Sequence, residues 1–196
     1  MKIVLGSSSI YRAQLLARIL TDFDIDSPSI DETPLADEPP ERLAIRLARE
    51  KAQAVGDRHP QSLVIGSDQV AILRENGGHT HILGKPGNLE AATAQLARCS
   101  GQRVEFAVAC CLLNTISGKL IEFQDTYRVH YKTLSDDTIA RYLQRDKPYD
   151  CAGSIKTEGL GIVLLASQSG SDPSTLIGLP LMALSNALES QGVRII

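Results

Sequence analysis

An aspartate lies inside a strongly apolar part of the sequence. Asp68 follows the run Leu63–Ile65 and the pair Gly66-Ser67, within the stretch LVIGSDQV. Because apolar runs of this length usually form buried strands, a carboxylate at this position needs a partner or a role in a reaction. A structural ion pair, a metal ligand and a group that orients water are all open interpretations of Asp68.

A hydroxyl-rich segment near the N-terminus could bind an anion. The stretch GSSSIYR follows an expected strand at Lys2–Leu5 and begins an expected helix. Backbone N–H groups and the helix dipole converge on an anion at such a junction, and Ser7, Ser9 and Arg12 would add donors and positive charge. A serine-rich helix cap followed by a surface arginine is the alternative. The glycine pattern of a P-loop is absent.

Two acids and two lysines occupy further positions suited to phosphate chemistry. Glu32 lies beside Asp31 in a proline-flanked loop, where carboxylates suit magnesium or manganese but also an ordinary solvated turn. Lys51 lies near the end of an expected helix, where lysine is common without any function. Lys85 is held in a short Gly-Lys-Pro segment, and Glu158 lies among the glycines of CAGSIKTEGLG. Together with the serines and Asp68, these groups indicate phosphate chemistry assisted by a metal.

The elements that must position these side chains alternate between strand and helix early in the chain and form hairpins in its middle. We expect strands at residues 2–5, 23–26, 62–73, 104–115, 120–131 and 161–166. We expect helices after residue 9 (with an apolar face reaching Leu20), at 41–55, from the cap Asn88 to 97, after the cap Ser135, and at 181–189. A hairpin turn is expected at Glu75–His79. This pattern predicts a mixed α/β sheet in one domain spanning residues 1–196, with residues from about 89 to 145 as a possible second lobe.

A basic stripe lies on the helix expected at Glu41–Val55. It contains Arg42, Arg46 and Arg49, at the spacing of one helical face. The simplest interpretation of this stripe is a solvated helix surface.

Composition narrows the classes of protein to consider. The chain has 196 residues, 43% of them hydrophobic, a net charge of −3, and few aromatic residues with no Trp. This balance argues against a nucleic-acid-binding surface. No apolar run approaches the ~20 residues of a membrane span, so we expect a cytoplasmic protein with no membrane partner. The four cysteines form no CxxC motif, and we expect reduced, buried thiols.

Six motifs, taken in order, resemble the Maf family of nucleotide pyrophosphatases. They are SSSIYR, SIDETP, EKA, GSDQV, GKP and CAGSIKTEGLG, and the match runs from residue 3 to about residue 185. Within the family the chain is similar to the subgroup that acts on 7-methyl-GTP. Gln69 and Glu158 stand where the dTTP/UTP subgroup typically has threonine and glutamine. Tyr11 departs from the tryptophan that is more frequent at its position.

The resemblance implies an elongated α/β fold with a deep central cleft, similar to the inosine-triphosphate pyrophosphatases, and usually a homodimer. It implies hydrolysis of a nucleoside triphosphate to a monophosphate and pyrophosphate, with a divalent cation (Mg or Mn). A second activity to consider is hydrolysis of dTTP and UTP. A nucleotide-binding regulator of cell division with little turnover is the alternative from another class.

The resemblance also implies roles for individual residues. Asp68 would be the general base, and Glu32 and Asp68 would hold the metal. The other assignments fall into two groups: phosphate contacts from Ser7, Ser9, Arg12, Lys51 and Lys85, and selection of the base by Tyr11, Gln69 and Glu158.

Overall fold

The computed structural model describes residues 1–75 and 78–196. Its strands over these residues are β1 (Lys2–Gly6), β2 (Asp24–Asp26), β3 (Ser62–Arg74), β4 (Thr80–Leu83), β5 (Arg103–Asn114), β6 (Leu120–Tyr131) and β7 (Leu165–Ser169). The α-helices are α1 (Ile10–Leu16), α2 (Pro40–Gly56), α3 (Leu89–Cys99), α4 (Asp136–Asp146) and α5 (Leu181–Ser190). Three 3-10 helices are η1 (Ala152–Ser154), η2 (Leu160–Leu164) and η3 (Pro173–Ile177).

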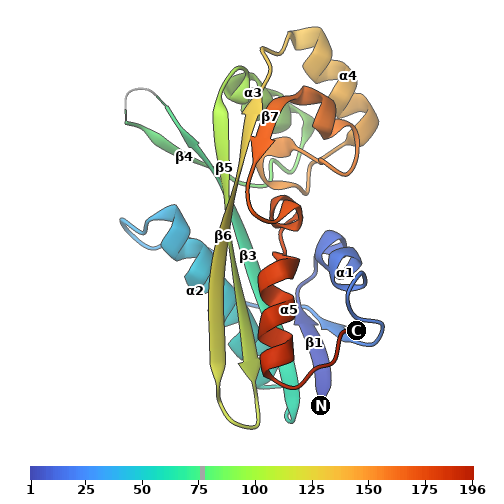
Figure 1. Ribbon diagram of the computed structural model, residues 1–196. Helices are drawn as coiled ribbons and strands as arrows, with labels where there is room; N and C mark the ends of the chain where they lie inside the picture. Colours follow the sequence, from blue (N-terminus) through green and yellow to red (C-terminus); the bar gives the residue numbers. More distant parts are fainter. Residues whose placement is uncertain (76–77) are drawn as a thin grey trace. The chain divides into compact units, whose positions relative to one another are not determined.

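The described strands form a seven-stranded sheet with the order β2-β1-β3-β5-β6-β7, in which β4 also pairs with β3 (Figure 1). Strand β1 is parallel to β2 and β3, whereas β3–β4 and β6–β7 are antiparallel. The expected mixed α/β sheet flanked by helices is therefore confirmed. No helix within residues 1–75 and 78–196 is both long and apolar enough to cross a membrane.

The chain divides into two compact units. Unit 1 consists of Met1–Gln69, Val108–Asp125 and Asp172–Ile196, and unit 2 of Val70–Ala107 and Thr126–Ser171. Strands β3, β5 and β6 contribute residues to both units. Most of the region expected as a second lobe falls in unit 2, but residues 108–125 belong to unit 1. The single domain spanning residues 1–196 and its central cleft stay predictions.

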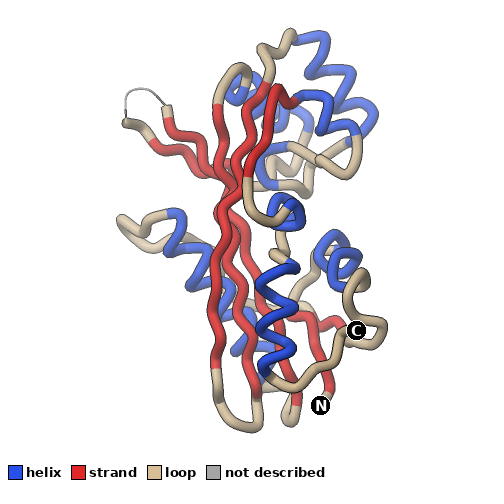
Figure 2. Tube along the Cα trace, viewed as in Figure 1, coloured by secondary structure: helices blue, strands red, loops and turns tan. Residues whose placement is uncertain are grey.

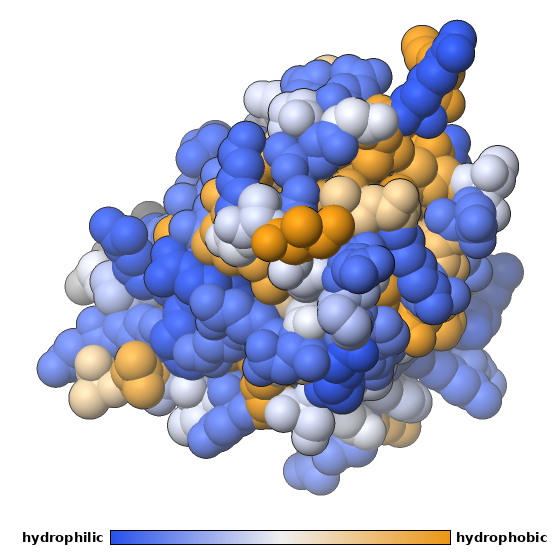
Figure 3. Space-filling view, turned by 90° about the horizontal axis from the view of Figure 1, so that it is seen from below, coloured by the Kyte–Doolittle hydropathy of each residue, from blue (hydrophilic) through white to orange (hydrophobic). Residues whose placement is uncertain are grey.

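In unit 1, helix α2 covers one face of the sheet, and helices α1 and α5 cover the other (Figure 1). The core on the α1 and α5 side is built from buried apolar side chains: Ile3, Leu5, Leu15, Leu16, Leu63, Ile65, Leu112, Leu184 and Leu188. Hydrophilic side chains cover much of the face seen in Figure 3. This separation of apolar and polar side chains fixes the faces on which α1, α2 and α5 pack.

The pairing of β1 with β3 aligns two of the motifs found in the sequence. Gly6 lies opposite Gly66 in this parallel pair. Strand β1 ends at Gly6 whereas β3 continues to Arg74, so the serine segment that follows β1 lies level with the pair Ser67-Asp68 inside β3.

Unit 2 contains α3, α4 and the strands around them, and both expected helix caps are confirmed there. The Asn88 side chain accepts a hydrogen bond from the Ala91 N–H at 2.9 Å, and Ser135 accepts one from Thr138 at 3.2 Å. The expected hairpin pairs β3 with β4, but Asn76 and Gly77 of its turn lie outside the described residues.

Two expected elements differ from the structure. The strand expected at 161–166 is wrong in its bounds, because residues 160–164 form η2 and strand β7 follows them. The reason is a tight turn: the Gly161 N–H donates to the Lys156 carbonyl at 2.9 Å, and a Cβ on Gly161 would lie 2.5 Å from that oxygen. Helix α1 ends at Leu16, earlier than expected, but Leu20 is still buried in the same core as Leu15 and Leu16.

Three of the four cysteines are buried as expected, whereas Cys151 is half-buried. All four are free thiols, and Cys99, Cys110 and Cys111 are buried. Burial raises the pKa of Cys99 and Cys111 to about 12, so these thiols stay protonated and unreactive.

Candidate active site

A buried ammonium in unit 1 joins the two carboxylates that the sequence singled out. Lys51 Nζ lies 2.7 Å from Asp68 Oδ1 and 2.8 Å from Glu32 Oε1. The side chains of Lys51 and Asp68 are 6% and 9% exposed, whereas that of Glu32 is 57% exposed. The lysine that seemed ordinary in the sequence is therefore the centre of a polar cluster. Burying a charge without a partner is costly, so each member of the buried pair depends on the other.

A glycine allows this cluster to form. Gly66 of β3 faces α2 so closely that an added Cβ would lie 2.2 Å from the Ala48 carbonyl oxygen and 2.6 Å from the Ala52 nitrogen. Helix α2 therefore packs directly on the backbone of β3. This contact brings Lys51, one residue before Ala52, against Asp68, two residues after Gly66.

Arg12 lies in the same unit, and its guanidinium donates hydrogen bonds to protein groups. Its Nη1 donates to the Ser67 carbonyl at 2.8 Å and to Ser7 Oγ at 3.4 Å, and its Nε donates to the Gly178 carbonyl at 3.0 Å. Burial lowers the pKa of the Arg12 guanidinium, while Asp68 has the opposite effect. An arginine remains protonated despite such a shift, so Arg12 adds a fixed positive charge beside Asp68.

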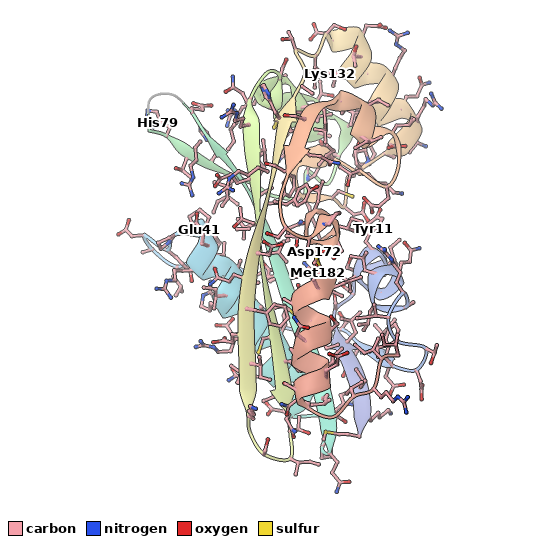
Figure 4. The ribbon with its side chains drawn as sticks, in the orientation of Figure 1. Tyr11, Glu41, His79, Lys132, Asp172 and Met182 are labelled. Carbon is pink, nitrogen blue, oxygen red and sulfur yellow. The ribbon has the colours of Figure 1, made fainter. Side chains whose placement is uncertain are left out.

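The serine segment has the helix-cap geometry that the sequence allowed as an alternative. Ser9 caps α1 by accepting a hydrogen bond from the Arg12 N–H at 3.3 Å. Ser7 is buried, and its hydroxyl accepts from the Ser9 N–H at 3.2 Å. Tyr11 is half-buried on α1 (Figure 4). The role of the two serines in phosphate binding stays a prediction.

Gln69 is anchored to the backbone of η3. Its Nε2 donates to the carbonyls of Thr175 at 3.2 Å and Leu176 at 2.9 Å. The 3-10 helix is in turn capped by buried Asp172, which accepts from the N–H groups of Ser174 and Met182 at 2.8 Å each (Figure 4). Because both amide hydrogens of Gln69 are used, its Oε1 is the atom left to accept a hydrogen bond from a ligand.

The remaining two site residues belong to unit 2. Lys85 and Glu158 are both exposed. The Glu158 carboxylate accepts a hydrogen bond from the Thr157 hydroxyl at 3.3 Å. The structure thus brings together Ser7, Arg12, Glu32, Lys51 and Asp68 within unit 1, and places Lys85 and Glu158 in the other unit.

Asp68 has the environment expected of a carboxylate used in chemistry. Burial raises its pKa above the ordinary value, and the positive charges of Lys51 and Arg12 oppose that shift. A carboxylate with a raised pKa is a better proton acceptor than an exposed one. Ser67, beside it, fixes the backbone by donating from Oγ to the carbonyls of Ala109 at 3.0 Å and Gly178 at 2.9 Å.

The carboxylates of Glu32 and Asp68 suit a hard divalent cation. No group of three or more His, Cys, Asp or Glu side chains that could hold a metal occurs within residues 1–75 and 78–196. Magnesium commonly takes only one or two protein carboxylates and completes its shell with water and phosphate oxygens. The pair of carboxylates around Lys51 fits that kind of site.

Three features of this site were missed in the sequence. The Gly66 contact with α2 has no signal beyond the glycine itself. The anchoring of Gln69 by η3 could have been suspected from Asp172-Pro173-Ser174, a pattern typical of a capped helix start. Arg46 and Glu38 form a bidentate ion pair at 2.8 Å for both contacts, so the basic stripe is not simply a solvated surface.

An α/β sheet that carries a buried acid–ammonium pair, with Asp68 inside β3, and a hydroxyl-rich helix cap after β1 is suited to a protein of the phosphate-handling class. The chain belongs to the Maf family, because its residues 2–191 match the family described as Maf-like protein.

Relatives similar to this chain over nearly its whole length carry the name 7-methyl-GTP pyrophosphatase. The protein from Nitrosococcus oceani is 49% identical over 190 residues, which cover 97% of this chain and 93% of that protein. The protein from Aromatoleum aromaticum is 50% identical over 192 residues, 98% and 96% of the two chains. Among solved structures, the Staphylococcus aureus Ham1 protein matches 68% of this chain and 73% of its own, with a TM-score of 0.49 and 17% identity.

Proposed function

We propose that this chain hydrolyses 7-methyl-GTP to 7-methyl-GMP and pyrophosphate. The observation that supports this most strongly is the buried pair of Asp68 and Lys51, 2.7 Å apart, in a chain 42–50% identical to proteins named 7-methyl-GTP pyrophosphatase. An activity on dTTP and UTP and a binding role without turnover are outcomes of the same experiment.

In the proposed reaction, a water oxygen attacks the α-phosphorus and the bond from this phosphorus to the oxygen leading to the β-phosphorus breaks. Asp68 accepts a proton from the water, and pyrophosphate leaves with the bridging oxygen. Lys51 keeps Asp68 ionised and oriented before the attack. Such a reaction depends on positioning and on neutralising phosphate charge, and it needs no covalent intermediate.

A divalent metal is part of this proposal. Glu32 and Asp68 would hold it, and it would supply neutralisation of the phosphate charge. Lys85 would add positive charge from the protein, and the charge of Arg12 would favour the ionised form of Asp68. Glu158 would accept hydrogen bonds from N1–H and the amino group of the guanine edge, and its charge would favour the cationic ring that N7 methylation creates. Tyr11 would stack on that ring.

A panel of nucleotides assayed for pyrophosphate release tests the proposal. Purified protein is offered 7-methyl-GTP, GTP, dTTP, UTP and ITP, with Mg²⁺ or Mn²⁺ and with a chelator. We expect the highest kcat/KM with 7-methyl-GTP and no turnover with the chelator. The variant Asp68→Asn should bind nucleotide and release almost no pyrophosphate. A preference for dTTP or UTP would show that 7-methyl-GTP is not the main substrate. Binding without any turnover would favour the regulatory role.

A further inference from the structure

Glu32 lies on a long connection that has little packing to hold it. Residues 27–39 join β2 to α2 and form no helix or strand, as the loop in Figure 2 shows. Most of these residues are exposed, including Glu32 and Thr33. Apolar burial therefore does not fix the position of the Glu32 carboxylate, and polar contacts must do so.

One guanidinium on α2 supplies those contacts. Arg46 donates from Nε and Nη2 to the two carboxylate oxygens of Glu38, at 2.8 Å each. Its Nη2 also donates to the Thr33 carbonyl at 3.1 Å. Glu38 in turn accepts from the Leu35 N–H at 3.0 Å, so the arginine and the glutamate together hold three points of the loop.

The Arg46–Glu38 pair is more enclosed than an ordinary surface ion pair. The two side chains are 20% and 9% exposed, and Glu50, one turn further along α2, accepts a further hydrogen bond from Arg46 Nη1 at 3.2 Å. A bidentate, partly buried pair has a fixed geometry that exposed pairs lack.

The same helix carries the ammonium that Glu32 contacts. Arg46 holds the carbonyl of Thr33, the residue next to Glu32, and Lys51 lies five positions after Arg46 on α2. Two contacts therefore attach adjacent loop residues to one rigid element. Lys51 Nζ lies 2.8 Å from Glu32 Oε1, and Arg46 Nη2 lies 3.1 Å from the Thr33 carbonyl oxygen. Helix α2 thereby holds the Glu32 carboxylate at Lys51, which also contacts Asp68.

We propose that Arg46 is a positioning residue that holds the loop of residues 27–39 on α2, so that Glu32 stays beside Lys51 and Asp68. This inference rests on the proposed function for the role of Glu32 in holding a divalent cation. In this proposal Arg46 touches neither the substrate nor the metal, and it acts only through Glu32.

The matched pair of variants is Arg46→Gln and Arg49→Gln. Arg49 lies on the same helix and forms a bidentate pair with Glu122, at 2.8 Å for both contacts, but no described contact joins it to the loop. Binding of Mn²⁺ to the protein without nucleotide is followed by electron paramagnetic resonance. We expect Arg46→Gln to weaken Mn²⁺ binding and kcat by about tenfold, the lower end for residues that orient metal ligands. Arg49→Gln should change neither by more than about twofold.

Combination with Glu32→Gln separates positioning from a general loss of structure. If Arg46 acts only through Glu32, then Arg46→Gln should cause no further loss of Mn²⁺ binding or kcat in the Glu32→Gln background. Equal losses in both backgrounds would overturn the proposal, and so would Arg46→Gln behaving like Arg49→Gln. The rate of amide hydrogen exchange in residues 27–39 should rise in Arg46→Gln but not in Arg49→Gln. If that variant does not fold, Arg46→Lys, which keeps the charge but not the bidentate contact, should show an intermediate effect.

The outcomes also distinguish this inference from the proposed function. If the wild-type protein releases no pyrophosphate from any nucleotide, the proposed function fails, while Mn²⁺ binding and hydrogen exchange still decide the role of Arg46. If the wild-type protein is active and the two arginine variants behave alike in all measurements, the positioning role is wrong and the activity stands.

Discussion

Replacing Gly66 by alanine should damage stability and activity together. A Cβ at this position would lie 2.2 Å from the Ala48 carbonyl oxygen, and contacts below 3.0 Å essentially never occur for real Cβ atoms. The obstacle is the backbone of α2, so the helix must move away from β3 by at least the difference, 0.8 Å. No side-chain rotation can relieve this contact.

The size of the effect follows from that displacement. Overpacking of a core contact costs about 1–3 kcal/mol. At about 2–4 °C per kcal/mol for a chain of this size, Tm should fall by about 2–12 °C. The contact from Lys51 to Asp68, now 2.7 Å, should lengthen as α2 moves. Because misplacement by ~1 Å near a reacting centre can cost about 100-fold, we expect kcat for pyrophosphate release to fall by about 10–100-fold.

Thermal unfolding followed by circular dichroism and a pyrophosphate-release assay measure the two effects. Gly56→Ala is the matched control. Gly56 is the last residue of the same helix, and its added Cβ would meet the flexible end of Leu113, with Cδ2 at 2.7 Å. That side chain can rotate away, and alanine favours the helix by about 1 kcal/mol. Unchanged Tm and kcat in Gly66→Ala, or an equal loss in Gly56→Ala, would refute the argument from close packing.

Three further predictions follow from the contacts of unit 1. Burial raises the pKa of Asp68. The fall of kcat/KM on the acidic side of its pH profile should therefore have an apparent pKa above 3.8, the ordinary value for Asp. An apparent pKa at or below 3.8 would contradict the role of Asp68 as the base. The ion pair with Arg46 lowers the pKa of Glu38 from 4.5 to about 2, so its stabilising effect is complete above pH 5 and is lost as the pH falls toward 2. The Tm of Glu38→Gln should therefore fall less than that of the wild type between pH 5 and pH 2, and parallel curves would exclude this contribution. Gln69→Glu should lower Tm more than Gln69→Ala, because the carboxylate would face the carbonyls of Thr175 and Leu176; the reverse order would show that these contacts do not hold η3.

Several features could be predicted from the sequence because they depend on neighbouring residues. The apolar run before Asp68 predicts a buried strand, and β3 has those bounds to within one residue. The caps Asn88 and Ser135 are local signals, and each accepts the expected hydrogen bond. The 3-10 helix before β7 could not be seen in the same way, because a short apolar run with glycines fits a strand and a tight turn equally well.

The contacts of the candidate site depend on residues far apart in the sequence. Lys51 looks like any lysine on a helix, and only the packing of α2 on Gly66 places it between Glu32 and Asp68. Arg46 belongs to an amphipathic pattern that is typical of a solvated face, because periodicity does not reveal that a loop folds back over that face. The ordered motifs singled out these residues, and the tertiary contacts show which of them lie together.

The charges of unit 1 explain why the proposed reaction needs cations from elsewhere. Arg12 and Lys51 carry two positive charges, and the carboxylates of Glu32 and Asp68 carry two negative charges, so the cluster has no surplus to offer a triphosphate. Arg12 directs three of its five N–H donors at Ser7 and two backbone carbonyls, and Lys51 directs two of its three at the carboxylates. These side chains are therefore better suited to holding Asp68 ionised and in place than to attracting the substrate. Under the proposed reaction the divalent metal would then neutralise the phosphates, and the protein groups of the cluster would orient the water.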